Sequence, residues 1–403
     1  MKSMRLFLLF VFSTAFFPLA SAQQAEVVAQ GKLRVATWNL LNLFDNFDHP
    51  VKPDEGTPPK SVADLRAMAK VIDALDADVL GVQEVENRSV LEKLNVHLKK
   101  PFLHIELIEG NDFRGIDNGV MSRLPIEKST SHRLRPLAAD HRFSRDFPVF
   151  RIRISKTATF DLGVVHFKSK RGKKERSDAW RAAEANEVAR IAKERQGDVG
   201  NLGLVVVGDF NDYKDSQPLA KLMAGFVDHT AVIPDKDRFT FIYRGKGEQI
   251  DFILSTPGMK SNRALIHRDT DFASDHFPVV VEFQVPEKVV RPVVPQGKPF
   301  EEPNRPNLEA TDLVKAKTLL LQEVEIEGTV TKVYRPKSGQ SISINFHQNY
   351  KQAITAYIPR QAMERMGDLD KLVGKKLRVR GPLSKHRNTF QIVVTRKEQL
   401  LTQ

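Results

Sequence analysis

The chain has 403 residues, no cysteine and a formal net charge of +12. The length predicts two or more domains, and the absence of cysteine excludes disulfides and thiolate metal sites, so any metal is held by oxygen or histidine. The excess positive charge favours a polyanionic partner such as nucleic acid, an anionic membrane or an acidic polysaccharide.

Residues 1–22 have the pattern of a cleaved signal peptide. Lys2 and Arg5 precede an apolar stretch over residues 6–19, and the small residues Ala20-Ser21-Ala22 follow as a cleavage site. The apolar stretch is short for a membrane span, and a signal anchor is the alternative. We expect a secreted or periplasmic protein whose mature form has no stable membrane span.

Two predicted strands with a helix between them each end in polar side chains. The first strand, 33–37, is followed by Asn39, and the second, 78–85, ends in a pair that includes Glu84. The stretch 61–75 between them has the apolar periodicity of an amphipathic helix. Ligands gather at strand ends in such βαβ units, so Glu84 is a candidate ligand for a hard cation. The pattern by itself points to a parallel sheet, and the alternative for both side chains is an exposed turn.

Arginines in two polar loops are candidates for phosphate binding. Arg114 lies in a loop rich in Gly, Asp and Asn, and Arg145 lies just before a predicted strand at 148–154. A guanidinium group binds phosphate in a bidentate manner. The alternative is a solvated surface charge.

A candidate catalytic histidine follows the predicted strand 160–165. His166 precedes a basic cluster in which Lys168 and Lys170 are placed to contact a phosphate backbone. A charge cluster is otherwise a solvated loop. A long helix is predicted over residues 177–195.

The buried strand 204–207 runs into Gly208-Asp209-Phe210-Asn211. A carboxylate and an amide at the end of a buried strand are typical of an active-site rim, although an Asx turn has the same residues. Further along, Asp251 is flanked by apolar residues in a strand and needs a partner because a buried lone carboxylate is costly. We predict that this partner is His276, oriented by Asp251 for proton transfer.

These motifs together resemble the endonuclease/exonuclease/phosphatase superfamily over roughly residues 31–285. They are Trp38-Asn39, Gln83-Glu84, His166, Gly208-Asp209-Phe210-Asn211, Asp251 and Ser274-Asp275-His276. The stretch His166-Phe167-Lys168-Ser169-Lys170 is most similar to the corresponding stretch of bacterial extracellular nucleases of that superfamily. The resemblance implies an α/β fold, a two-sheet αββα sandwich with mainly antiparallel sheets. It also implies phosphodiester hydrolysis assisted by Mg²⁺ or Mn²⁺, with Ca²⁺ as a further candidate.

The resemblance also implies roles for single residues. Glu84 binds the metal with Asn39 and Asp275 close to it, and Asp209 and Asn211 position water and the scissile phosphate. His276 and His166 flank the phosphate, and which group is base or acid stays open. Asp117 is the candidate carboxylate behind His166.

The sequence predicts a separate C-terminal module over residues 308–403. Residues 286–307 contain six prolines, which predicts a semi-rigid, extended linker that holds the module away from the preceding domain. Residues 308–403 predict five strands, at 321–334, 341–347, 353–358, 375–382 and 389–395, with a helical patch at 360–366. Their order resembles a small all-β OB-like barrel.

The composition of this module favours a polyanion. Residues 307–403 contain 17 Lys or Arg and 9 Asp or Glu, a net of +8. Phe346, Tyr350, Tyr357 and Phe390 are candidates for stacking on bases or for the barrel core.

The sequence therefore predicts a secreted, metal-dependent phosphodiesterase that hydrolyses nucleic acid, and we expect an endonuclease acting on DNA. The rival enzyme hypothesis is a phosphodiesterase or phosphatase of the same superfamily acting on phospholipids or sugar phosphates. A non-catalytic extracellular protein that binds DNA or matrix is the other rival.

Overall fold

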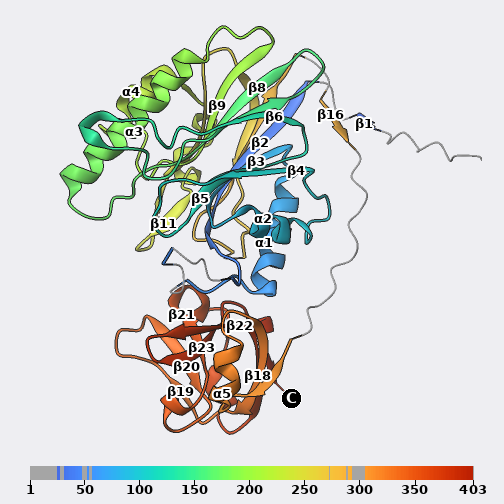
Figure 1. Ribbon diagram of the computed structural model, residues 1–403, viewed down its shortest axis with the longest axis vertical. Helices are drawn as coiled ribbons and strands as arrows, with labels where there is room; N and C mark the ends of the chain where they lie inside the picture. The colour runs from blue at the N-terminus through green and yellow to red at the C-terminus, as the bar shows by residue number, and fades with distance from the viewer. Residues whose placement is uncertain are drawn as a thin grey trace, which may run out of the picture.

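A computed structural model of the chain describes residues 25–27, 31–47, 52–53, 57–271, 273–286, 289–292 and 305–402. The predicted signal peptide lies outside the described residues, as do residues 287–288 and 293–304 of the predicted linker. Figure 1 shows two parts, a larger α/β part and a smaller β-rich unit formed by the C-terminal residues. Among the described residues, no helix has the length and apolar character needed to cross a membrane.

Two six-stranded sheets form the centre of the larger part. The first has the order β14-β15-β2-β3-β5-β4 and consists of β2 (Lys32–Leu43), β3 (Val79–Val85), β4 (His104–Ile108), β5 (Asp117–Ser122), β14 (Lys260–Ile266) and β15 (Val279–Gln284). The second has the order β10-β13-β9-β8-β7-β6 and consists of β6 (Ile126–Thr130), β7 (Val149–Arg153), β8 (Thr159–His166), β9 (Asn201–Asp209), β10 (Val227–Asp228) and β13 (Asp251–Ser255).

Each sheet contains one parallel strand pair, and each pair is joined by a helix. α1 (Val62–Leu75) connects β2 to β3, and α3 (Lys174–Glu194) connects β8 to β9. The other pairings in the two sheets are antiparallel. The βαβ pattern therefore predicts the β2–α1–β3 unit correctly and is wrong for the sheets as wholes, which are mixed; the second unit, β8–α3–β9, was not predicted as βαβ.

The larger part has four layers, helices, sheet, sheet and helices, and a buried apolar cluster lies between each layer and the next. Val35, Phe150 and Val207 belong to a buried cluster between the two sheets, to which both sheets contribute. α1 and α2 (Arg88–Asn95) cover the outer face of the first sheet, and α3 and α4 (Ala220–Gly225) cover that of the second. This is the expected αββα sandwich, stabilised by burial of apolar surface on both faces of each sheet.

The C-terminal unit has a core of its own and a single eight-stranded sheet. Its elements are β17 (Asn307–Glu309), α5 (Leu313–Thr318), β18 (Glu323–Thr329), β19 (Lys332–Tyr334), β20 (Ser341–Asn345), β21 (Thr355–Pro359), α6 (Arg360–Met363), β22 (Lys376–His386), β23 (Thr389–Val393) and β24 (Leu400–Thr402). From one strand to its hydrogen-bonded neighbour, the order is β18-β22-β23-β21-β20-β19. The first and last strands of this order, β18 and β19, follow one another directly in the chain, so the sheet curves back on itself. All five predicted strands are present; β17, β24 and α5 were not predicted.

Two short pairs lie outside these sheets. β1 (Ala25–Val27) pairs with β16 (Val290–Pro292), and β11 (Phe241–Tyr243) forms a hairpin with β12 (Lys246–Glu248).

Buried Arg396 connects the C-terminal unit to the larger part. Its side chain is 5% exposed, and its Nε lies 3.1 Å from Oδ1 of Asp64 in the first turn of α1. The guanidinium also donates to the Asp271 carbonyl oxygen at 3.0 Å, and the Thr395 hydroxyl donates to Asp64 at 2.7 Å. The expectation that the linker holds the module away from the catalytic part is therefore wrong, since the unit packs below α1 (Figure 1).

Arg396→Ala is expected to lower the free energy of unfolding by about 3 kcal/mol, because it leaves the buried Asp64 carboxylate without its cation. Urea unfolding followed by tryptophan fluorescence measures this change. The matched control is Arg335→Ala, which removes an exposed ion pair with Asp370 on the same unit and is expected to cost less than about 1 kcal/mol. Equal effects of the two substitutions would contradict a stabilising interface.

Candidate active site

Three neighbouring strand ends of the second sheet place polar side chains in one row. His166 is the last residue of β8, Asp209 the last of β9, and Asp251 the first of β13. The strand register pairs His166 with Asp209 and Asp209 with Asp251. All three side chains are buried. Gly208 permits this close pairing, since its φ is +134° and a Cβ there would lie 2.0 Å from the Val165 carbonyl oxygen.

The first sheet brings two predicted site residues to the same place. The Asn39 side chain, on β2, donates from Nδ2 to Asp209 Oδ2 at 3.3 Å. Glu84, on β3, has its Oε1 3.8 Å from His166 Nε2, and its Oε2 accepts from the Asn42 amide at 3.0 Å. Glu84 and Asn42 have left-handed backbones with φ of 60° and 53°. Such conformations are costly for side-chain-bearing residues and occur often at functional sites.

His276 is held by three contacts to other parts of the chain. The Trp38 indole donates to its carbonyl oxygen at 2.9 Å, and the Ser274 hydroxyl accepts from its amide at 3.1 Å. Its Nδ1 lies 2.9 Å from Asp251 Oδ2, which is the pairing that the sequence predicts. The roles assigned to the pair remain predictions.

Asp209 lies between the two histidines, with its Oδ2 3.6 Å from His166 Nε2 and 3.8 Å from His276 Nε2. Burial and the nearby Arg145 hold the pKa of His166 well below its usual value. Burial opposes the charge of His276, but the attraction of Asp251 and Asp209 outweighs it and raises its pKa well above the usual value. Burial raises the pKa of Asp209 to about 7. At neutral pH the site therefore pairs a neutral imidazole with a charged one.

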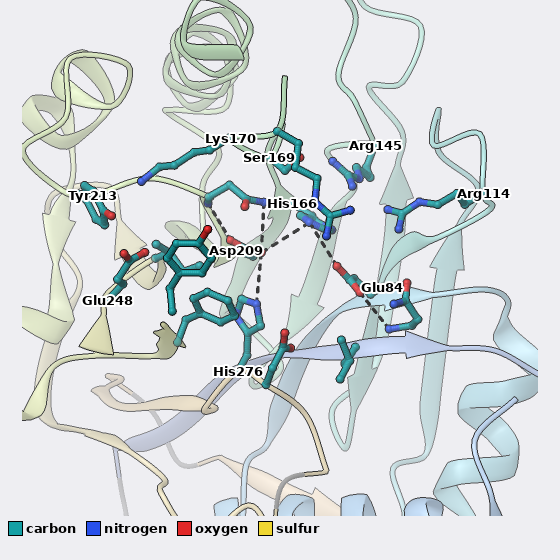
Figure 2. A pocket seen from close by; sticks show the side chains of 18 residues that line it. Glu84, Arg114, Arg145, His166, Ser169, Lys170, Asp209, Tyr213, Glu248 and His276 are labelled. Atoms are coloured by element: carbon teal, nitrogen blue, oxygen red, sulfur yellow. Dashed lines mark hydrogen bonds and ion pairs between the residues drawn. The ribbon is translucent and has the colours of Figure 1, made fainter. Parts of the chain in front are cut away.

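A cavity of about 550 Å³ opens over this row of side chains. Figure 2 shows Glu84, His166, Asp209 and His276 converging on it, with Arg114 and Arg145 on one side and Tyr213 and Glu248 on the other. The sequence did not predict the side of the cavity that contains Tyr213. The β11–β12 hairpin completes this side with Phe241, Tyr243 and Glu248. Phe241 of this hairpin packs 4.9 Å from the His276 ring and stacks on Tyr243 at 6.5 Å between centroids.

Both predicted arginines line the cavity, and one carboxylate holds them. Asp112 Oδ1 lies 3.2 Å from Arg114 Nε, and its Oδ2 lies 3.1 Å from Arg145 Nε. Arg145 and Asp112 are both almost fully buried, at 7% side-chain exposure each. The two guanidinium groups are thus fixed in place before any anion binds, which lowers the ordering cost of phosphate binding.

The two predicted lysines have different positions. Lys170 lines the catalytic cavity, with its Nζ 3.4 Å from the Tyr213 ring centroid and 3.4 Å from Asp212 Oδ1. Lys168 lines a neighbouring cavity beside Trp180, and its contact with a phosphate backbone stays a prediction. Asn211 does line the catalytic cavity, where its amide donates to the Phe167 carbonyl oxygen at 3.0 Å and to Asp209.

The hypothesis that Asp117 lies behind His166 is wrong. Asp117 Oδ1 accepts from the Gly110 amide at 2.7 Å, and its side chain lines a separate cavity. Asp117 begins β5, and its carboxylate is bound by the Gly110 amide in the preceding loop instead of by His166. His166 Nδ1 is buried and has no hydrogen-bond partner among the described residues.

Asp117→Asn is expected to stabilise the protein at about pH 8 and to have little effect near pH 4. Burial raises the pKa of Asp117 from 3.8 to about 7, so stability is lost as pH rises from the unfolded pKa to the folded one. The difference amounts to at most about 4 kcal/mol. Thermal unfolding of both proteins across this range measures it. The control is exposed Asp235→Asn, for which no comparable pH-dependent difference is expected.

The donor set fits a divalent cation. Glu84, Asp209 and Asp275 line the cavity and offer carboxylate oxygens. The ligand atoms of Asp209, Asp251 and His276 also lie within 4.8 Å of one another, but a charged His276 has no free lone pair, so only the carboxylates of this group suit a cation. Asp251 Oδ1 is buried and has no hydrogen-bond partner among the described residues, while its Oδ2 faces His276. Carboxylates with no thiolate suit Mg²⁺ or Mn²⁺. The Asn39 amide is occupied at both ends, by Asp209 and by the Leu41 amide, so Asn39 fits the positioning of Asp209 better than ligation.

The fold and this site define a hydrolase, and a protein-family model described as "Endonuclease/Exonuclease/phosphatase family" matches residues 36–276. This match covers more than half of the chain. The chain belongs to the endonuclease/exonuclease/phosphatase family, whose members generally use a divalent metal.

Solved structures with a similar fold include three from different organisms. Truncated TDP2 of Caenorhabditis elegans is 17% identical, covering 63% of this chain and 98% of that chain, with a TM-score of 0.44. The human Nocturnin catalytic domain with a bound sulfate anion is 16% identical, covering 64% and 97%, with a TM-score of 0.45. A family protein from Bacteroides thetaiotaomicron is 17% identical, covering 63% and 95%, with a TM-score of 0.45. No curated protein matches the chain.

Proposed function

We propose that this protein is a secreted, metal-dependent phosphodiesterase that hydrolyses nucleic acid, with DNA as the expected substrate. The observation that carries the proposal is the placement of buried Asp209 between two histidines in a cavity with arginines on its rim. Phosphodiester hydrolysis needs an activated water, a neutralised phosphate and a protonated leaving oxygen.

Each of these needs has a candidate group in the cavity. Neutral His166 is a proton acceptor and charged His276 a proton donor, because their pKa values are shifted in opposite directions. Arg114 and Arg145 bind the phosphate oxygens, and Asn211 orients groups beside Asp209. A divalent cation held by Glu84 and neighbouring carboxylates would polarise the phosphate and the water.

The C-terminal unit supports a polymeric substrate. The parallel pairing of β21 with β23, which correspond to the third and fifth of the five predicted strands, supports the proposal of an OB-like barrel. Its net charge of +8 favours an anionic polymer. We propose that residues 308–403 are a module that binds nucleic acid and does no chemistry.

Phospholipid head groups are the second candidate substrate. Ile242 and Tyr243, in the hairpin beside the catalytic cavity, are 48% and 50% exposed. Exposed apolar side chains next to an active site suit contact with a lipid surface. The basic surface of the protein suits anionic lipids equally well.

The deciding experiment incubates purified protein with DNA, both as plasmid and as single strands, with RNA and with sphingomyelin vesicles, each with and without EDTA. We expect cleavage of DNA that stops in EDTA and returns with Mg²⁺ or Mn²⁺. Turnover of sphingomyelin alone would assign the protein to the second candidate. Absence of turnover of all three substrates, with retained DNA binding, would favour a non-catalytic binding protein.

A further inference from the structure

Three cavities share lining residues and follow one another across the two parts of the protein. Leu41 and Asn42 line both the catalytic cavity and a second cavity of about 330 Å³. Tyr357 and Gln391 line both the second cavity and a third of about 630 Å³. We call this series of three cavities the track.

The second cavity lies at the interface that Arg396 closes. Lys60 and Ser61, at the start of α1, line it from the larger part, and Arg365 and Thr395 line it from the C-terminal unit. The third cavity lies on the face formed by β19, β20, β21 and β23. The track therefore begins at His276 and ends on the barrel, and the interface holds its two ends in a fixed relation.

All five tyrosines of the chain line the track. Tyr213 and Tyr243 lie in the catalytic cavity, Tyr357 lines the second and third cavities, and Tyr334 and Tyr350 lie in the third. Tyr334 and Tyr350 are 47% and 48% exposed. Such half-exposed rings are flat surfaces on which nucleobases stack with little preference for sequence.

The charges along the track suit a phosphate backbone. The third cavity is lined by Lys332 and His386 together with amides and hydroxyls, and no carboxylate is among its lining residues within the described chain. The second cavity contains Lys60 and Arg365, and Asp64, the carboxylate that lines it, is bound by Arg396. Cations and aromatic rings in succession are the combination found in channels for single-stranded nucleic acid.

We propose that one strand of nucleic acid occupies the track, with its scissile phosphate beside His166 and His276 and its further nucleotides on the C-terminal unit. This inference rests on the proposed nuclease function and specifies the form of the substrate. The strand is single because the bases of a duplex are stacked on one another and present no free face to Tyr334 or Tyr350. The fixed interface sets the separation between the scissile phosphate and the bases on the C-terminal unit.

The test compares single-stranded DNA of about 4, 8 and 16 nucleotides with a blunt duplex of the longest sequence, a range that spans reported barrel site sizes. For the wild-type protein, KM is expected to fall as the single strand lengthens. In Tyr334→Ala/Tyr350→Ala, KM for the longest strand is expected to rise roughly tenfold or more, and the rise becomes smaller as the strand shortens. Exposed Val314→Ala on the same unit, outside the track, is the matched control and is expected to behave as wild type.

Each other outcome overturns a different statement. If wild-type KM does not depend on strand length and the double substitution leaves it unchanged, the track is wrong while the nuclease function stands. Tighter binding of an acidic oligosaccharide than of DNA, lost in the double variant, would assign the third cavity to polysaccharide and overturn the inference. Hydrolysis of no nucleic acid at all would instead refute the proposed function. Unchanged thermal unfolding of the variants shows that they are folded.

Discussion

His276→Ala is expected to lower kcat about 10³-fold, in the range for loss of a proton-transfer group. Combining it with Asp251→Asn should lower kcat no further. His276 Nδ1 lies 2.9 Å from Asp251 Oδ2, so the carboxylate acts through the imidazole, and parts of one unit are not additive. Steady-state kinetics of both single variants and the double variant on a small phosphodiester measure this.

The control is His347→Ala, which removes a histidine on the C-terminal unit whose Nδ1 interacts with the backbone of Asn349. It is expected to leave kcat unchanged. Losses for His276→Ala and Asp251→Asn that multiply in the double variant would show that Asp251 acts separately, as a ligand to the cation or as a proton carrier. That result would refute the pairing.

Glu84→Gln is expected to lower kcat about 10²-fold or more, in the range for loss of one electrostatic stabiliser. Glutamine keeps the shape of the side chain and the acceptor for the Asn42 amide, which lies 3.0 Å from Oε2. The substitution therefore removes the charge and little else. Calorimetric titration with Mn²⁺ should show weaker binding in parallel with the lost activity.

Glu92→Gln is the matched control, because Glu92 is an exposed carboxylate paired with Arg88 on α2. It is expected to change neither activity nor Mn²⁺ affinity. Full activity of protein stripped of metal by EDTA, or normal Mn²⁺ binding by Glu84→Gln, would remove Glu84 from the metal site and contradict the mechanism.

Local pattern was sufficient for much of the fold. The Ser61 cap and apolar periodicity predict α1, where Ser61 and Asp64 form a reciprocal capping box, and β-branched runs predict β3, β8 and β9. These features depend on neighbouring residues, so the sequence carries them directly. Strands such as β4, β6 and β14 were not predicted, because they are partly exposed and lack continuous apolar runs.

His166, Asp209 and Asp251 were readable from the sequence as candidate site residues because each stands at the end of a buried strand, whereas His276 lies in the segment before β15. A carboxylate such as Asp209 or an imidazole such as His276 in a buried position serves mainly in proton transfer or metal binding. The resemblance identified the family. The pairing of Asp251 with His276 was predictable because a buried carboxylate needs a partner. Asp117 was assigned behind His166 from the resemblance alone, and this failed because the sequence does not show which partner the side chain of a strand residue meets in the folded protein.

The tertiary structure alone decided what distant segments do together. Asp112 holds both arginines, the β11–β12 hairpin walls the cavity, and Arg396 binds Asp64 more than 300 residues away. Such contacts depend on strand order and on how the C-terminal unit packs, and no local periodicity encodes them. The sequence by itself determined the strands, the helices and the kinds of catalytic side chain, because these follow from neighbouring residues. Only the folding of remote segments against one another forms the cavity, places Asp112 between two arginines and connects the cavity to the C-terminal unit through the track.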